Sequence, residues 1–154
     1  YMACAAWQIL RRRSVPPSAL AGSVTLYISI TGLVYNLILS HVPILLSGSP
    51  ASILLHFVAP IMAMLDWLFF VAHGRLRWRA ALYWLSYPLA YLAFALIRGL
   101  IIIGPHRYPY FFVDVDKLGY GGVARNTVIF ALAFWLLGIV LVVIDLVLTR
   151  REKI

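Results

Sequence analysis

Long apolar stretches alternate with short polar segments along most of this chain. A helix that spans a membrane needs about 20 consecutive, predominantly apolar residues. Stretches of that length predict four complete spans, at about residues 18–42, 52–72, 79–103 and 122–148. A shorter apolar stretch at about residues 1–10 predicts the end of a fifth span. The pattern therefore predicts an all-α, polytopic transmembrane helix bundle that forms a single transmembrane domain over residues 1–154.

The polar segments between the predicted spans carry residues that favour turns. The segment RRRSVPPS at 11–18 holds two prolines, which are not tolerated in the interior of a helix. The segment PILLSGSPAS at 43–52 is rich in Pro, Gly and Ser, and GPHRYPYFFVDVDKLGYGG at 104–122 also carries several turn residues. We interpret these segments as loops, and no part of the sequence predicts a soluble domain.

Lysine and arginine residues are distributed unevenly among the loops. The loop at 43–52 has none, whereas three clusters follow the first, third and fifth apolar stretches: Arg11, Arg12 and Arg13; Arg75, Arg77 and Arg79; Arg150, Arg151 and Lys153. Loops on the cytoplasmic side of a membrane carry the excess of Lys and Arg. We therefore expect a multi-pass protein of the cell membrane, with these clusters and the C-terminus in the cytoplasm.

Composition agrees with a membrane protein and argues against some other classes. The chain is 64% hydrophobic and 12% charged, whereas soluble domains average about 45–50% and about 25%. The net charge of +8 comes from clusters at the ends of spans and not from a basic face that reads a polymer, so we expect no nucleic acid partner. Membrane lipids are the expected partners. The single cysteine, Cys4, cannot form an intrachain disulfide.

Motifs of the common cofactor and metal sites are missing from the sequence. It contains no HExxH, GxSxG, P-loop or GxGxxG pattern. A haem held by two histidines would need them at matched depth on different spans, but His41, His73 and His106 fall at span ends or in loops. The sequence also shows no internal repeat with interrupted helices, which is the pattern typical of a transporter. We therefore expect neither a cofactor nor a metal site.

Several polar residues fall inside the predicted spans, where a charge costs about 2.5–3.5 kcal/mol on insertion scales. His56, Asn36 and Arg98 lie in the outer part of their spans, and Asn126 lies near the outer end of the last span. Each has a structural alternative. The histidine and the asparagines can join helices by hydrogen bonds, which average near 0.6 kcal/mol. The arginine can extend its charged end to the outer headgroups.

Two aspartates lie outside this group. Asp66 is near the middle of its span and lies about 15 Å along the helix axis from His56, so the two cannot form a catalytic pair. We expect Asp66 to have a structural role, either paired with an arginine or protonated. Asp145 lies near the inner end of the last span, where Arg150 and Arg151 offer a simple charge partner.

Five short motifs occur in a familiar order along the chain: ITGLVYNLIL at 30–39, LLHFVAP at 54–60, GRLRW at 74–78, YPLAY at 87–91 and RYPYFFVDV at 107–115. Together they resemble the androgen-induced membrane protein family, whose animal members hydrolyse fatty acid esters of hydroxy fatty acids, and most of all its bacterial branch. The resemblance covers about residues 11–154. It implies six spans in the full-length protein, so that one span and most of another precede Tyr1.

The resemblance also implies a reaction. Members of the family use a threonine nucleophile in the second span and a histidine at the start of the fourth. His56 matches that histidine, whereas Thr25, Thr31 and Thr127 do not match the threonine, which falls upstream of Tyr1. The implied function is a lipid-ester hydrolase with its active site in the extracytoplasmic half of the bilayer and His56 as the base.

Three further residues are our own predictions for this site. Arg98 is a candidate to bind the carboxylate of a fatty acid by charge-assisted hydrogen bonds. Asn36 or Asn126 is a candidate to support the oxyanion that forms during ester cleavage. The competing hypothesis is a non-catalytic accessory subunit, or lipid-binding scaffold, of a larger membrane-protein complex.

Overall fold

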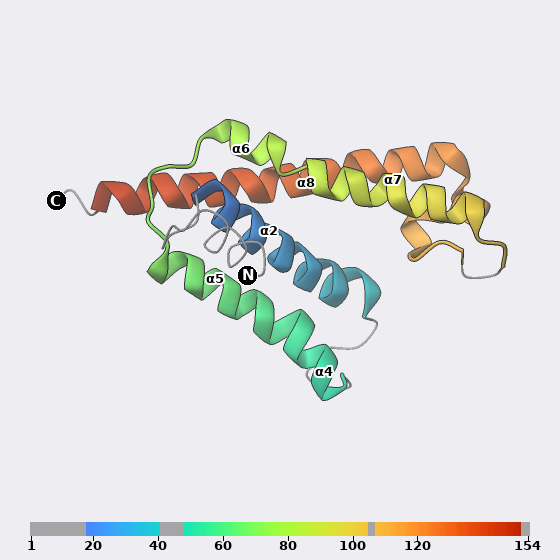
Figure 1. Ribbon diagram of the computed structural model, residues 1–154, viewed down its shortest axis with the longest axis horizontal. Coiled ribbons are helices and arrows are strands. Elements are labelled where there is room, and N and C mark those ends of the chain that lie inside the picture. The colour runs from blue at the N-terminus through green and yellow to red at the C-terminus, as the bar shows by residue number, and fades with distance from the viewer. Residues whose placement is uncertain (1–17, 41–47, 105–106, 152–154) are drawn as a thin grey trace, which may run out of the picture. The chain divides into compact units, whose positions relative to one another are not determined.

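A computed structural model describes residues 18–40, 48–104 and 107–151 (Figure 1). Every regular element within these ranges is a helix. Four helical stretches are long and apolar enough to cross a membrane: Ser18–Leu39, Pro50–Phe70, Trp78–Ile101 and Val115–Thr149. They confirm the all-α, polytopic fold with four complete spans, although the last stretch begins earlier than predicted. The partial span predicted at residues 1–10 lies outside the described residues.

Contacts within the chain form two compact units, one made of residues 1–76 and 141–154 and the other of residues 77–140. The described helices of the first unit are α2 (Ser18–Val34), η1 (Tyr35–Leu39), α4 (Pro50–Ile53), η2 (Leu54–Val58) and α5 (Ala59–Phe70), together with the end of α8 (Val115–Arg151). The labels η1 and η2 denote single π-helical turns. The second unit contains α6 (Trp78–Tyr83), α7 (Ser86–Ile101), the 3₁₀ turn η3 (Phe111–Val113) and the first part of α8.

Helices α2 and α5 lie side by side in the first unit, and a glycine allows their close approach (Figure 1). A Cβ atom on Gly32 would lie only 2.6 Å from Cγ of Pro60 and 3.0 Å from the carbonyl oxygen of His56. Trp67 and Ala63 of α5 are almost completely buried, each with an exposed fraction of 1%. This contact therefore requires a residue without a side chain on α2.

Pro60 also explains the π-helical turn that precedes it. Proline has no backbone N–H, and its ring clashes with the carbonyl four residues earlier in a regular helix, which here is the carbonyl of His56. The backbone around this proline follows a wider turn, in which the N–H of Ala59 donates to the carbonyl of Leu54. The carbonyl of His56 is consequently available to a partner outside its own helix.

The second unit is held by a tight contact between its helices. A Cβ atom on Gly138 of α8 would lie 3.0 Å from Cβ of Ala81 in α6, and Ala81 is fully buried. Helix α8 is interrupted near its start at Gly119, whose φ of 65° lies in the left-handed region that favours glycine. The carboxylate of Asp114 accepts a hydrogen bond of 3.0 Å from the N–H of Asp116, as a helix N-cap residue does.

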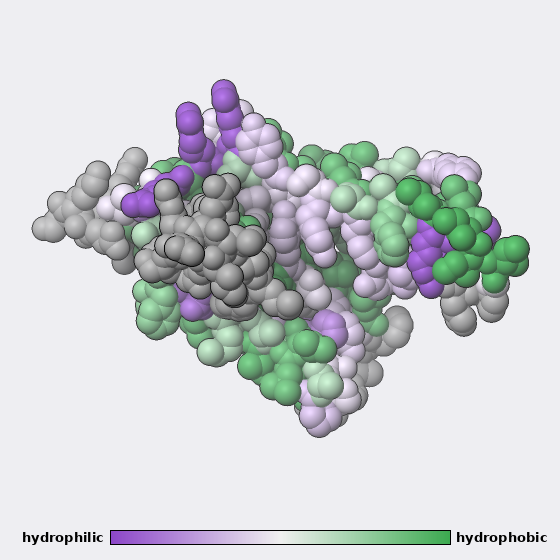
Figure 2. Space-filling view, in the orientation of Figure 1, coloured by the Kyte–Doolittle hydropathy of each residue, from purple (hydrophilic) through white to green (hydrophobic). Residues whose placement is uncertain are grey.

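Large apolar side chains remain exposed on both units. Examples with exposed fractions above 70% are Leu37, Phe69, Phe70, Tyr83, Ile101 and Ile103. Apolar side chains also cover much of the visible surface in Figure 2. Extended apolar surface of this kind marks a region that contacts lipid or another protein, which agrees with helices that cross a membrane.

Candidate functional site

His56 lies in the π-helical turn η2 and is half-buried. Its ring stacks on the ring of Tyr35, with 3.8 Å between the centroids and 12° between the planes. Its Nδ1 atom lies 3.2 Å from the carbonyl oxygen of Ser52. A carbonyl only accepts hydrogen bonds, so Nδ1 carries the hydrogen, and Nε2 of the neutral ring holds a lone pair. Nε2 makes no hydrogen bond to any other described residue, so this nitrogen can accept a proton.

Asn36 lies directly beside this histidine. Its side-chain amide donates to the carbonyl of Gly32 at 2.8 Å and to the carbonyl of His56 at 2.9 Å. The second bond satisfies the carbonyl that Pro60 leaves without a helical partner. Both amide hydrogens of Asn36 are therefore engaged in joining α2 to η2. Its predicted part in supporting an oxyanion stays a prediction, and it requires one of these two bonds to be exchanged.

Arg98 and Asn126 belong to the other unit, where both hold the loop at 107–113. The guanidinium of Arg98 donates from Nη1 to the carbonyl of Arg107 at 2.6 Å. The side-chain amide of Asn126 donates to the carbonyl of Phe112 at 3.0 Å. The structure thus brings His56 and Asn36 into contact, and it brings Arg98 and Asn126 to one loop. Carboxylate binding by Arg98 and oxyanion support by Asn126 stay predictions.

Aromatic contacts fix the same loop against its neighbouring helices. The ring of Tyr110 lies 6.3 Å from that of Tyr91 in α7 and stacks on Phe112 at 5.1 Å. Phe112 in turn lies 4.8 Å from Phe130 of α8. Tyr110 and Phe112 of the motif RYPYFF therefore pack in an aromatic cluster with residues of α7 and α8.

One exposed ion pair closes this loop. The guanidinium of Arg107 donates to both carboxylate oxygens of Asp116, with 2.6 Å between Nε and Oδ2. The hydrogen bond with Asp116 raises the pKa of Arg107 above its usual value. Because both side chains face the surroundings of the protein, the pair contributes little to stability.

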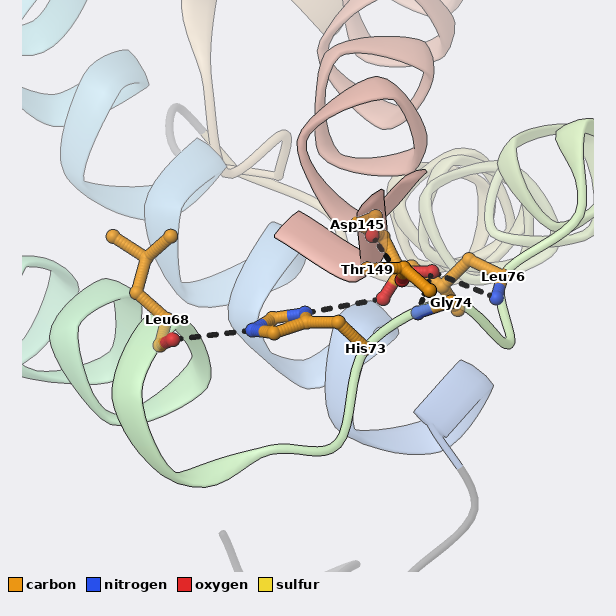
Figure 3. A network of polar contacts seen from close by, with 6 residues as sticks. All are labelled: Leu68, His73, Gly74, Leu76, Asp145 and Thr149. Atoms are coloured by element: carbon orange, nitrogen blue, oxygen red, sulfur yellow. Dashed lines mark hydrogen bonds and ion pairs between the residues drawn. The ribbon is translucent and has the colours of Figure 1, made fainter. Parts of the chain in front are cut away.

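Sequence reasoning missed a second polar cluster, which joins the loop after α5 to the end of α8 (Figure 3). His73 lies between two acceptors, with Nδ1 at 3.1 Å from Oδ1 of Asp145 and Nε2 at 3.1 Å from the carbonyl oxygen of Leu68. Oδ2 of Asp145 accepts from the backbone N–H groups of Gly74 at 2.9 Å and Leu76 at 3.0 Å. Asp145 is completely buried, and the side chain of His73 is 5% exposed.

The geometry of this cluster leaves neither ring nitrogen of His73 without a partner. Nδ1 faces the carboxylate of Asp145, and Nε2 faces the backbone carbonyl of Leu68. The two N–H donors at Oδ2 and the His73 ring at Oδ1 give both carboxylate oxygens of Asp145 a partner. The ring of Trp67 contacts the His73 ring edge-on, with 4.9 Å between the centroids, and helps to enclose it. His73 is therefore a structural residue with no ring nitrogen available for chemistry.

Gly74 is the signal from which this cluster could have been predicted. Its φ of 84° favours glycine, and a Cβ atom there would lie 2.6 Å from Cγ2 of Thr149. A His-Gly pair directly after one span, and Asp145 near the inner end of another, are expected at the same membrane depth. We expected Arg150 or Arg151 to partner Asp145, but their side chains lie outside the described part of the chain.

Asp66 has a different outcome from Asp145. It is half-buried in α5 and makes no hydrogen bond or ion pair with another described residue. Its predicted arginine partner stays a prediction. Within the described ranges, no three His, Cys, Asp or Glu side chains lie close enough together to hold a metal ion.

Comparison of the chain with protein-family models, with curated proteins and with solved structures finds no match. A proposal about function rests on these side chains and on the motif resemblance described above.

Proposed function

We propose that this protein is a lipid-ester hydrolase of the cell membrane in which His56 is the general base. The observation that carries the proposal is the state of the His56 ring. Nδ1 is occupied by the carbonyl of Ser52, the ring plane lies against Tyr35, and Nε2 has no partner among the described residues. A hydroxyl nucleophile needs a base of this kind within hydrogen-bond reach.

The nucleophile in this proposal is a threonine on a helix that precedes Tyr1, as the resemblance implies. Nε2 of His56 accepts the hydroxyl proton while the threonine oxygen bonds to the ester carbonyl carbon. The ester C–O bond then breaks, and the imidazolium returns the proton to the departing alkoxide to give the alcohol. Water then attacks the acyl carbon while the same nitrogen takes its proton. The C–O bond to the threonine oxygen breaks and the fatty acid is released, and the imidazolium gives its proton to the threonine oxygen, which restores the hydroxyl.

The proposed site lies in the extracytoplasmic half of the bilayer, with the C-terminus in the cytoplasm. An ester carbonyl of a membrane lipid lies near the headgroup boundary, which is the depth we propose for His56. Arg98 is the proposed partner of a fatty acid carboxylate, because a guanidinium binds such a group by charge-assisted hydrogen bonds. Membrane lipids supply the substrate class, an amphiphilic acyl ester.

A second candidate function is a non-catalytic subunit or lipid-binding scaffold of a larger membrane complex. One observation favours it. Asn36, Arg98 and Asn126, three of the four predicted site residues, donate hydrogen bonds to backbone carbonyls and thereby serve packing. A protein that keeps such contacts but lacks the nucleophile retains the fold and loses the reaction.

The proposal is tested with the full-length protein in detergent and a fluorophosphonate probe. His56→Asn is the informative variant, because its amide nitrogen can still donate to the Ser52 carbonyl while the basic Nε2 is removed. We expect the wild type to be labelled on a threonine, and the labelling rate to fall about 10²–10⁴-fold in His56→Asn. Thr31→Val, at an exposed position of α2, is the matched control and keeps the wild-type rate.

Two outcomes count against the proposal. A folded wild type that takes up no label is not a hydrolase of this type, and the scaffold function is then preferred. Labelling that proceeds at the same rate in His56→Asn removes His56 from the mechanism. If the wild type is labelled, mass spectrometry of the labelled peptide identifies the nucleophile.

A further inference from the structure

Two neighbouring residues of η1 contact the same histidine in different ways. Tyr35 stacks on the ring of His56, and Asn36 binds the carbonyl oxygen of His56. Successive residues of a regular helix point about 100° apart, so neighbours seldom face one partner together. Here the ring and the backbone of a single residue are both held from η1, while the Ser52 carbonyl holds Nδ1 from within the histidine's own helix.

The sequence around these contacts explains how this arrangement arises. Pro60 releases the carbonyl of His56 from helical hydrogen bonding, so that Asn36 can bind it. Gly32, which presents only a hydrogen to Pro60, lets α2 approach closely enough for that bond. The π-helical turn η1 comes directly after α2 in the chain, and its first two residues are Tyr35 and Asn36. Turns of this type are frequent at functional sites.

We propose that Tyr35 is a positioning residue, whose stacked ring holds the His56 imidazole with Nδ1 against the Ser52 carbonyl and thereby keeps Nε2 as the basic nitrogen. The catalytic meaning of this inference rests on the proposed hydrolase function, but the tautomer does not. The Ser52 bond selects the nitrogen that carries hydrogen. The Tyr35 ring restricts rotation that would break that bond, and the Asn36 contact fixes the backbone from which the ring extends.

The tautomer of His56 can be measured without any substrate. We would record ¹⁵N NMR spectra of histidine-labelled full-length protein in detergent, at a pH where His56 is neutral, and assign its signals by comparison with His56→Asn. The expected wild-type spectrum has a protonated Nδ1 and an unprotonated Nε2. A wild-type spectrum with hydrogen on Nε2 overturns the inference, and that result needs no further variant.

Two substitutions of Tyr35 then separate stacking from the hydroxyl group. Tyr35→Phe keeps the aromatic ring and is expected to keep the wild-type tautomer and labelling rate. Tyr35→Leu removes the ring, and we expect a mixture of both tautomers with a fluorophosphonate labelling rate lowered about fivefold. An unchanged tautomer in Tyr35→Leu overturns the positioning role.

The two proposals fail in distinguishable ways. If Tyr35→Leu changes the tautomer but no variant is ever labelled, the positioning role stands and the hydrolase function is rejected. If labelling depends on His56 while the tautomer and the rate are unaffected in Tyr35→Leu, the hydrolase function stands and Tyr35 has no part in it.

Discussion

His56 and His73 belong to the same unit, and they differ in what their ring nitrogens contact. His73 has an acceptor at each nitrogen, a carboxylate at Nδ1 and a backbone carbonyl at Nε2. His56 has an acceptor at Nδ1 alone. Both ring nitrogens of His73 are therefore engaged in hydrogen bonds, whereas Nε2 of His56 has no partner among the described residues.

For these two histidines, position relative to the predicted spans is a poor guide to the role of the side chain. His73 follows the end of a span, where a solvated loop residue is expected, yet its side chain is 5% exposed and bonded to a buried carboxylate. His56 lies within a span and is only half-buried. The number of partners that a ring finds in the fold decides whether it stabilises the structure or remains available for chemistry.

The largest expected effect comes from breaking the His73 pair. Asp145→Asn replaces one carboxylate oxygen with an N–H₂ group, which cannot accept from Gly74 and Leu76 or from His73, whichever way it is turned. Loss of one partner from a buried pair costs about 3–5 kcal/mol of the free energy of unfolding. Chemical denaturation in detergent measures it, with His56→Asn expected to change stability by less than about 1 kcal/mol.

Asp116→Asn is the matched control for this substitution. It removes the partner of Arg107 from an exposed pair, so the unfolding midpoint is expected to stay at the wild-type value. An Asp145→Asn protein as stable as the wild type would show that the buried cluster contributes nothing, and the distinction between the two histidines would then fail.

An intermediate effect is expected where α2 meets His56. Gly32→Ala introduces a Cβ atom 2.6 Å from the Pro60 ring, so the two helices must separate. Overpacking of this kind costs about 1–3 kcal/mol. Thermal unfolding in detergent provides the measurement. Gly121→Ala, whose Cβ atom would meet no neighbour within 4 Å, should be neutral or stabilising because alanine favours a helix. Equal losses in both variants would contradict the close contact at Gly32.

The smallest effect is expected for the bond between Asn36 and the His56 carbonyl. Asn36→Leu should lower the free energy of unfolding by about 0.6 kcal/mol and by no more than about 1.7 kcal/mol. In a Pro60→Ala background, the restored N–H can satisfy that carbonyl within the helix, so the same substitution should cost less. A double-mutant cycle measures the difference. Strictly additive effects would mean that Pro60 does not release the carbonyl for Asn36.

Several features were predictable because they depend on local sequence. Helix number and approximate bounds follow from apolar length, which is why the stretches at 50–70 and 78–101 lie within two residues of their predicted positions. The last helix begins at Val115 rather than near Gly122 because a short helical segment precedes it. Gly119, with its positive φ, forms the kink that joins this segment to the long helix. His56 could be proposed as a base from its motif, but the motif says nothing about which ring nitrogen is available.

By itself, the sequence determined that the chain is all-α and carries four stretches able to cross a membrane, because burial of an apolar helix in lipid depends mainly on length and composition. Only the tertiary structure decided which polar groups meet. Asp145 reaches His73 across a separation of 72 positions, and Asn36 reaches the His56 carbonyl across 20. Such pairs depend on where helices approach each other, and that is set by Gly32, Gly74 and Pro60 acting through contacts distant in sequence.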